Sequence, residues 1–117
     1  MTNADFDSPP EYHRAMLVPE GTDPTLVREL LALTLRSVRG LDAQHFTQRS
    51  LHALIERTTN ALDLSHRAAC QVLGVALTGR PAQTLRDVAS TMLQLGKEAT
   101  LTRLRTAHLM ITDVASA

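Results

Sequence analysis

The sequence predicts an all-α protein, a compact bundle of about six helices. Hydrophobic residues make up 44% of the 117 residues and aromatic residues only 3%. The apolar side chains are chiefly leucine and alanine, which favour helix over sheet, and they recur at three- and four-residue spacing without any alternation of period two. A chain of this length buries a modest core without staples, so we expect one domain over residues 8–117 after a flexible N-terminus at residues 1–7.

Two helix starts in the first third of the chain combine a capping residue with proline. Ser8, two prolines in the first turn and a glutamate three residues on predict a short helix that ends near Leu17. Asp23 and Pro24 repeat the signal and predict a second helix that ends at Gly40. Its apolar residues occupy more than one face, so we expect it to be covered on two sides.

Hydroxyl-bearing caps mark the next two helices. Thr47 precedes a helix with a single apolar stripe, and Ser65 precedes one that ends at Gly79. A fifth helix begins at Pro81 or Thr84, and a sixth completes the bundle.

The fifth helix stops at Gly96 and the last begins at Lys97, with His108 on its inward stripe. We expect His108 to be a core histidine with one hydrogen-bond partner. The predicted core comprises Leu30, Leu54, Ile55, Val72, Leu73, Leu77, Val88, Met92, Leu101 and Leu104.

The sequence contains no pattern typical of catalysis, metal binding or membrane insertion. The single cysteine, Cys70, lies among apolar residues and is expected to be a buried, inert thiol. The five histidines are scattered, and we identify no pair that places two metal ligands on one face. No nucleophile with a base, paired carboxylates or phosphate-binding glycine loop is recognisable, and no apolar run approaches the roughly 20 residues of a membrane span. We therefore expect a cytoplasmic protein that is not an enzyme and needs no cofactor or metal.

Charge is balanced overall but not along the chain. The net charge is zero, which argues against strong nonspecific binding to nucleic acid. Residues 1–60 hold eight acids and six arginines, whereas residues 61–117 hold four acids and six basic residues. Any contact with RNA is therefore expected on the second half of the chain.

Three short phrases in a fixed order suggest a family. They are V-A-L-T-G at residues 75–79, L-G-K-E at residues 95–98, and a leucine, arginine, leucine and alanine at Leu101, Arg103, Leu104 and Ala107. Upstream, Phe46 and Thr47 open a helix with a phenylalanine-threonine pair. This arrangement resembles the C-terminal anticodon-binding domain of bacterial glutamyl-tRNA synthetases. The two phrases typical of the catalytic domain of such synthetases, H-I-G-H and K-M-S-K-S, are absent from the sequence.

The resemblance implies a non-catalytic helical module that binds tRNA or another structured RNA. In the family, the loop after the V-A-L-T-G helix approaches the anticodon bases. Loop bases in single-stranded RNA can be read by arginine, short polar side chains and free backbone amides. Lys97 could add a phosphate contact. The RNA-binding residues implied in this way are Arg80, Pro81, Gln83, Thr84, Arg86 and Lys97.

The sequence departs from the family in the region that reads the bases. Gly74 stands where the family has an arginine, and the family's serine-proline-x-leucine phrase is not recognisable at residues 83–86. The interval from Gly79 to Leu95 is also roughly two residues longer. Glycine inside a helix is unfavourable by about 0.5–1 kcal/mol relative to alanine, so we expect either close packing of another helix at Gly74 or a surface that has lost its base-reading arginine.

Two other functions remain open from the sequence. The first is a helical protein-protein interaction module that kept the fold and binds a synthetase, another protein or its own copy. The second is a DNA-binding regulator, because residues 64–75 resemble the first helix and turn of many repressors, although the following segment breaks where a recognition helix should continue. Met1 and the polar start favour a natural beginning, but the sequence is also compatible with a piece of a longer synthetase. Neither the RNA nor the oligomeric state follows from it.

Overall fold

Every regular element that the structure describes is helical. This computed structural model describes the backbone of residues 14–116 and the side chains of residues 16–111. The elements in chain order are α2 (Arg14–Leu17), α3 (Pro24–Arg39), the 3-10 helix η1 (Ala43–His45), α4 (Gln48–Ala61), α5 (His66–Thr78), α6 (Leu85–Leu95) and α7 (Lys97–Ser116). No strand occurs among these residues, and the all-α prediction is confirmed.

The described residues form five long helices, whereas the sequence predicts about six helices in all, the first of them short. Five helices, α3 to α7, contain eleven residues or more, against the six expected. The first predicted helix accounts for the difference, because only the four residues of α2 are described, ending at Leu17 as expected. Its predicted cap, Ser8, and the flexible N-terminus predicted at residues 1–7 lie outside the described residues.

Side-chain caps fix the starts of four helices. The side chains of Asp23, Thr47, Ser65 and Thr84 each accept a hydrogen bond from a backbone N–H of the following turn, which satisfies one of the unpaired donors at a helix N-terminus. The choice between Pro81 and Thr84 for the start of α6 is thereby resolved in favour of Thr84. These local signals are confirmed residue by residue.

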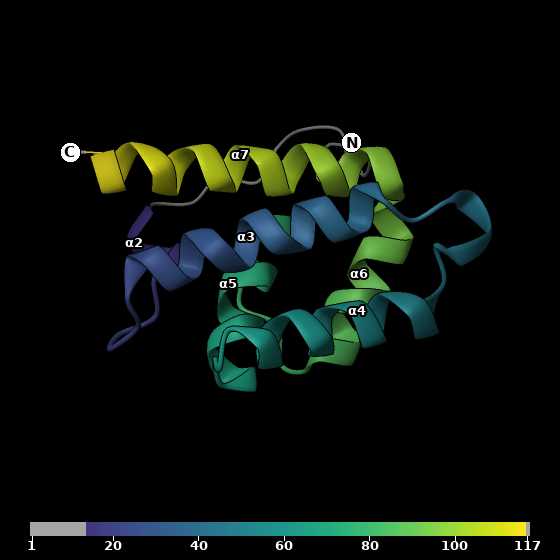
Figure 1. Cartoon of the computed structure of the whole chain (residues 1–117), viewed down its shortest axis with the longest axis horizontal. Coiled ribbons are helices and arrows are strands. Elements are labelled where there is room, and N and C mark those ends of the chain that lie inside the picture. The colour runs from purple at the N-terminus through teal and green to yellow at the C-terminus, as the bar shows by residue number, and fades with distance from the viewer. Residues whose placement is uncertain (1–13, 117) are drawn as a thin grey trace.

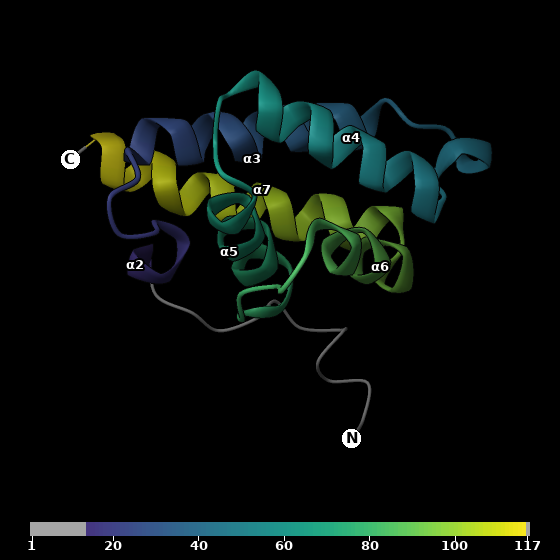
Figure 2. The ribbon, with the colours of Figure 1, turned by 90° about the horizontal axis from the view of Figure 1, so that it is seen from below.

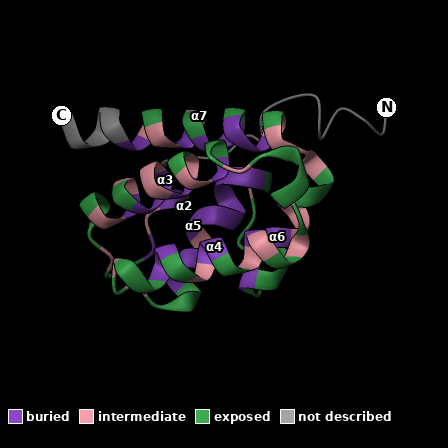
Figure 3. Cartoon of the chain, turned by 45° about the vertical axis from the view of Figure 1, so that its right-hand side comes forward, coloured by how far each residue is buried: buried purple, intermediate pink, exposed green. Residues whose placement is uncertain are grey.

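Helices α2, α3, α6 and α7 pack against α5. Figure 1 shows α3 between α7 and α4, and α3 contacts both of them, so the expectation that this helix is covered on two sides is confirmed. Figure 2 shows α5 between α2 and α6, and α5 also contacts α7. In Figure 3 the purple of buried residues covers most of α5, where nine of the ten residues from Ala68 to Leu77 are buried.

The core contains all ten residues that the sequence predicts, each at most 7% exposed. The prediction for the last helix needs one correction. His108 is half-buried, and the fully buried residue at this point of the inward stripe is Ala107. None of the helices in the described part of the chain is long and apolar enough to cross a membrane.

The structure contradicts the helix-turn-helix interpretation. Residues 66–78 form one uninterrupted helix, α5, so the turn that a repressor would have near Gly74 falls in the middle of this helix. α6 follows only after the loop at residues 79–84. No recognition helix therefore follows residues 64–75 at the short spacing of a helix-turn-helix motif.

The side chain of Arg103 lies inside the bundle and closes the end of α5. It is 4% exposed, and its Nη1 donates a 2.6 Å hydrogen bond to the carbonyl oxygen of Leu77 in the last turn of α5. The last carbonyls of a helix lack partners within the helix and carry partial negative charge. Arg103 therefore holds α7 against α5. Because its side chain is buried, this arginine is not available for contact with RNA.

We expect Arg103→Met to destabilise the protein by about 1.5–3 kcal/mol, because it removes a charge-assisted hydrogen bond and leaves the Leu77 carbonyl buried without that donor. Chemical denaturation followed by circular dichroism measures the loss. The matched control is Arg105→Met, two residues further along α7 at an exposed position, which should change stability by less than about 0.5 kcal/mol. Equal effects at the two positions would show that the buried hydrogen bond contributes nothing.

Candidate functional site

The loop after α5 folds back onto the helix that it leaves. Gly79 adopts the left-handed conformation, with φ of 85°, and ends α5. The backbone N–H of Ala82 then donates a 3.1 Å hydrogen bond to the carbonyl oxygen of Cys70, more than two helical turns back along α5. The loop is therefore attached to the helix by its own backbone.

The hydroxyl of Thr78 provides a second attachment. Its Oγ1 lies 2.9 Å from the carbonyl oxygen of Gly74 and 3.2 Å from that of Arg80, so it has an acceptor on the helix and one on the loop. The same oxygen accepts a 3.2 Å hydrogen bond from the backbone N–H of Arg80. Together with the bond at Ala82, these contacts fix both ends of the segment at residues 80–82.

Gly74 is the position where the loop approaches α5 most closely. A Cβ atom there would lie 2.3 Å from the backbone nitrogen of Ala82, 2.6 Å from the carbonyl oxygen of Arg80 and 2.8 Å from the carbonyl carbon of Pro81. The packing explanation for this glycine is therefore correct, but the neighbour is the backbone of the loop and not another helix. The arginine that the family resemblance implies at this position cannot be accommodated without moving the loop.

Five of the six predicted site residues lie on or directly after this loop, and all five are exposed. Gln83, Thr84 and Arg86 line a common hollow, whereas Arg80 and Pro81 are not among its lining residues. The structure thus brings together the three residues nearest the start of α6.

Lys97 lies apart from the other predicted residues. It begins α7, after the C-terminal end of α6, whereas Arg86 lies in the first turn of α6; eleven residues of helix place these ends about 16 Å apart. The Lys97 ammonium donates a hydrogen bond to the carbonyl oxygen of Leu41, in the link after α3. Lys97 therefore has a hydrogen bond within the protein. Its contact with a phosphate stays a prediction.

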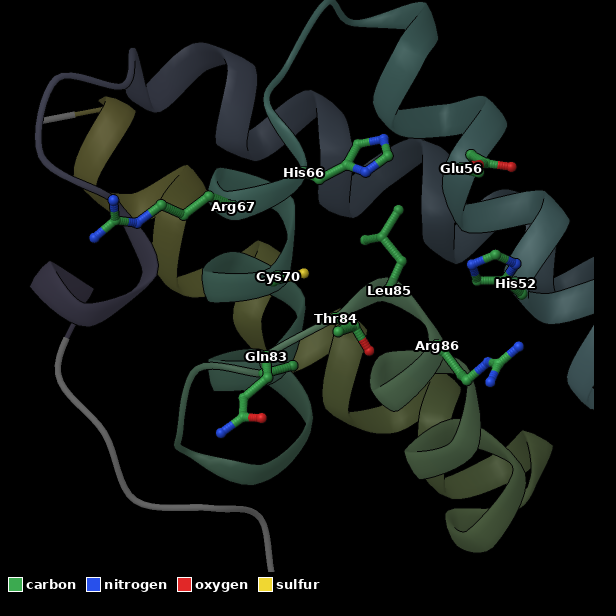
Figure 4. A pocket seen from close by; sticks show the side chains of 10 residues that line it. His52, Glu56, His66, Arg67, Cys70, Gln83, Thr84, Leu85 and Arg86 are labelled. Atoms are coloured by element: carbon green, nitrogen blue, oxygen red, sulfur yellow. The ribbon is translucent and has the colours of Figure 1, made fainter.

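A hollow of about 620 Å³ lies between α4, the first turns of α5 and the start of α6. Figure 4 shows His52 and Glu56 on α4, with the Glu56 carboxylate directed away from Leu85, and His66 and Cys70 on α5. Gln48 on α4 links this helix to α6 with two hydrogen bonds. Its amide nitrogen donates to the carbonyl oxygen of Arg86 at 3.1 Å, and its amide oxygen accepts from the Ser90 hydroxyl at 3.0 Å. The full lining is His52, Glu56, His66, Arg67, Cys70, Ala82, Gln83, Thr84, Leu85 and Arg86.

The hollow combines an apolar floor with a rim of nitrogen donors. Cys70 and Leu85 are 3% and 4% exposed. Burial raises the pKa of the Cys70 thiol, and the nearby negative charge of Asp87 raises it further. This thiol therefore stays protonated at neutral pH, which agrees with the expected inert cysteine. Figure 4 shows Arg67 directed away from the hollow.

Three titratable residues of this site, His52, Glu56 and His66, were not predicted from the sequence. A signal for them was present, because His52 and Glu56 are four residues apart, as are His66 and Cys70, and residues at this spacing share a face of a helix. The expectation that no pair of possible metal ligands shares a helix face is thus wrong, because His52 and Glu56 form such a pair. Within the described residues, however, no group of three histidine, cysteine or acidic side chains is arranged to hold a metal ion.

The fold and the site define an all-helical domain that presents a fixed polar loop beside a hollow with basic groups on its rim. The chain belongs to the family of anticodon-binding domains, which matches residues 2–108. It is similar to glutamate–tRNA ligase 1 of Sphingopyxis alaskensis, with 35% identity over 79 residues. These residues are 68% of this chain but span only 16% of that ligase. No solved structure gives a significant match. The resemblance to the anticodon-binding domain of glutamyl-tRNA synthetases is confirmed.

Proposed function

We propose that this domain binds tRNA or another structured RNA, without catalysing a reaction, through the loop at residues 80–84 and the start of α6. The observation that carries the proposal is the attachment of this loop to α5 at Cys70 and Thr78, with polar side chains left exposed on it. Membership of the anticodon-binding family supports RNA as the partner. The absence of both synthetase signature phrases from the sequence supports a role without catalysis.

A fixed loop suits the reading of unstacked bases. The loop needs no large rearrangement to present Arg80, Gln83 and Thr84, so little ordering entropy is lost on binding. Long-range attraction contributes less, because the net charge of the chain is zero. We therefore expect moderate affinity that depends on a few local contacts more than on nonspecific attraction to phosphates.

The salt dependence of tRNA binding tests this proposal. We expect a slope of log affinity against log salt that corresponds to roughly three to five phosphates, at about 0.7–0.9 per contact. The double variant Arg80→Ala, Arg86→Ala should weaken binding and reduce the slope by about one to two, because both side chains are exposed at the proposed surface. Gel retardation or fluorescence anisotropy with bulk tRNA at several salt concentrations measures both quantities.

The control for this double variant removes two arginines elsewhere. Arg28 and Arg36 lie on α3, outside the loop and the lining of the hollow, so Arg28→Ala, Arg36→Ala should leave affinity and slope unchanged. Equal losses from the two pairs would remove the loop as the site. No retardation of tRNA at low salt would overturn the proposal and favour the interaction module that binds a protein.

A further inference from the structure

We propose that Gln48 is a positioning residue for RNA binding: its side-chain amide holds the first turn of α6 so that Arg86, in that turn, can meet a phosphate of the RNA. This inference rests on the proposed function and adds to it a residue of α4, outside the loop and outside the set that the sequence predicts. In this role Gln48 need not touch the RNA, because it acts through Arg86.

The amide of Gln48 joins the starts of α4 and α6, which are distant in sequence. Its nitrogen donates to the carbonyl oxygen of Arg86 at 3.1 Å, 38 positions later in the chain, and its oxygen accepts from the Ser90 hydroxyl at 3.0 Å. Arg86 and Ser90 are four residues apart and therefore lie on one face of α6. Because both polar groups of the amide are used, the direction of this side chain is fixed.

Gln48 is firmly held on its own helix. It is the first residue of α4 and follows the cap Thr47, whose Oγ1 accepts a 3.2 Å hydrogen bond from the backbone N–H of Ser50. Gln48 is also half-buried, so its hydrogen bonds are electrostatically stronger than those of a fully hydrated side chain. The start of α4 therefore offers a fixed point to which the start of α6 is attached.

Beyond its own cap, the first turn of α6 has little support. Thr84 accepts a hydrogen bond from the backbone N–H of Asp87, and of the four residues 84–87 Leu85 alone is buried. The guanidinium of Arg86 has no hydrogen bond or ion pair with another described residue. Its placement thus depends on the backbone from which it extends, and Gln48 holds that backbone. A side chain that extends from a fixed point loses less freedom when it binds a phosphate.

Gln71 makes a matching contact away from the proposed RNA surface. It too is half-buried, and its amide nitrogen donates a 3.1 Å hydrogen bond to the carbonyl oxygen of Met16, which joins α5 to α2. Neither of these residues belongs to the loop at residues 80–84 or to the start of α6. Loss of this bond should therefore affect stability alone, whereas loss of the bonds of Gln48 should affect stability and RNA binding.

The test compares Gln48→Met with Gln71→Met, since methionine keeps the length of the side chain and removes its hydrogen bonds. Fluorescence anisotropy with bulk tRNA measures affinity and its salt dependence, and thermal denaturation shows that each variant is folded at the temperature of the assay. Gln48→Met should weaken tRNA binding about two- to tenfold, the effect of ordering one more long side chain on binding. It should also reduce the salt slope by up to about 0.7–0.9, the share of one phosphate. Gln71→Met should change neither quantity.

A double-mutant cycle with Arg86→Ala shows whether Gln48 acts through this arginine. Arg86→Ala keeps the backbone carbonyl that Gln48 contacts, so the structural cost of Gln48→Met is the same in this background. Its effect on tRNA affinity should fall below about twofold there, but should persist in full beside Arg80→Ala. Ser90→Ala, which removes one of the two hydrogen bonds, should give a smaller loss that also requires Arg86.

Three results would contradict this assignment. An unchanged affinity for Gln48→Met, or an equal loss with and without Arg86, would overturn the inference while the proposed function stands, because the parent chain still binds tRNA. Equal losses for Gln48→Met and Gln71→Met would overturn it as well, since both would then act through stability alone. A parent chain that binds no tRNA would overturn the proposed function and this inference together.

Discussion

Gly74→Arg is expected to destabilise the protein by about 3 kcal/mol or more and to detach the loop from α5. The first side-chain atom would already lie 2.3–2.8 Å from three backbone atoms at residues 80–82. Backbone atoms cannot rotate away as a flexible side chain can, so the loop must move as a unit, and overpacking alone typically costs about 1–3 kcal/mol. The hydrogen bond from Ala82 to Cys70 would also be lost. The gain in helix propensity, about 1 kcal/mol at most, is too small to compensate.

Urea denaturation measures the stability of this variant, and amide hydrogen exchange of Ala82 reports on the loop. The matched glycine is Gly40, which follows α3 with an ordinary φ of −77°. A Cβ there would meet its nearest neighbours, the carbonyl oxygens of Arg36 and Ser37, at 3.6 Å. Gly40→Ala should therefore be neutral or stabilise by up to about 1 kcal/mol. A Gly74→Arg variant as stable as the parent, with slow exchange at Ala82, would contradict the close approach.

Leu104→Ala is the second substitution with a large expected effect, a loss of about 2–5 kcal/mol. Leu104 is fully buried on α7, which contacts α3, α5, α6 and α2. Neighbours held by so many helices cannot easily collapse into the space that the smaller side chain leaves, so the cost should lie in the upper half of that range.

Leu109 offers a matched control on the same helix. It is 57% exposed, so Leu109→Ala should cost less than about 1 kcal/mol by thermal or chemical denaturation. A loss below about 1 kcal/mol for Leu104→Ala would mean that α7 does not close the core as its burial indicates.

The parts of the fold that depend on neighbours in sequence were predictable. Thr47 and Ser65 cap helices because a hydroxyl next to an apolar periodic run satisfies a free amide two or three residues on. Gly79 ends α5 because a left-handed residue is needed there. The helix end at Gly79 and the cap at Thr84 also located the loop that carries the candidate site. The three- and four-residue spacing of apolar residues predicted the core.

The remainder depends on contacts between residues that are distant in sequence. The packing of α4 and α5 against α6 puts His52 and His66 into one hollow, and no spacing in the sequence predicts that packing. Lys97 meets a carbonyl oxygen 56 positions earlier in the chain. The neighbour of Gly74 was expected to be a helix, because a loop that turns back along its own helix leaves no periodic pattern.

The approach of the loop to Gly74 also constrains how this sequence can diverge. An arginine at this position and the present course of residues 80–82 exclude each other sterically, so neither can change alone without loss of packing. Relatives with this longer loop should carry glycine here, and relatives with a side chain here should carry a shorter or differently routed loop. Substitution and loop length would then covary across the family, and a change to arginine at this position would be tolerated only together with a change in the loop.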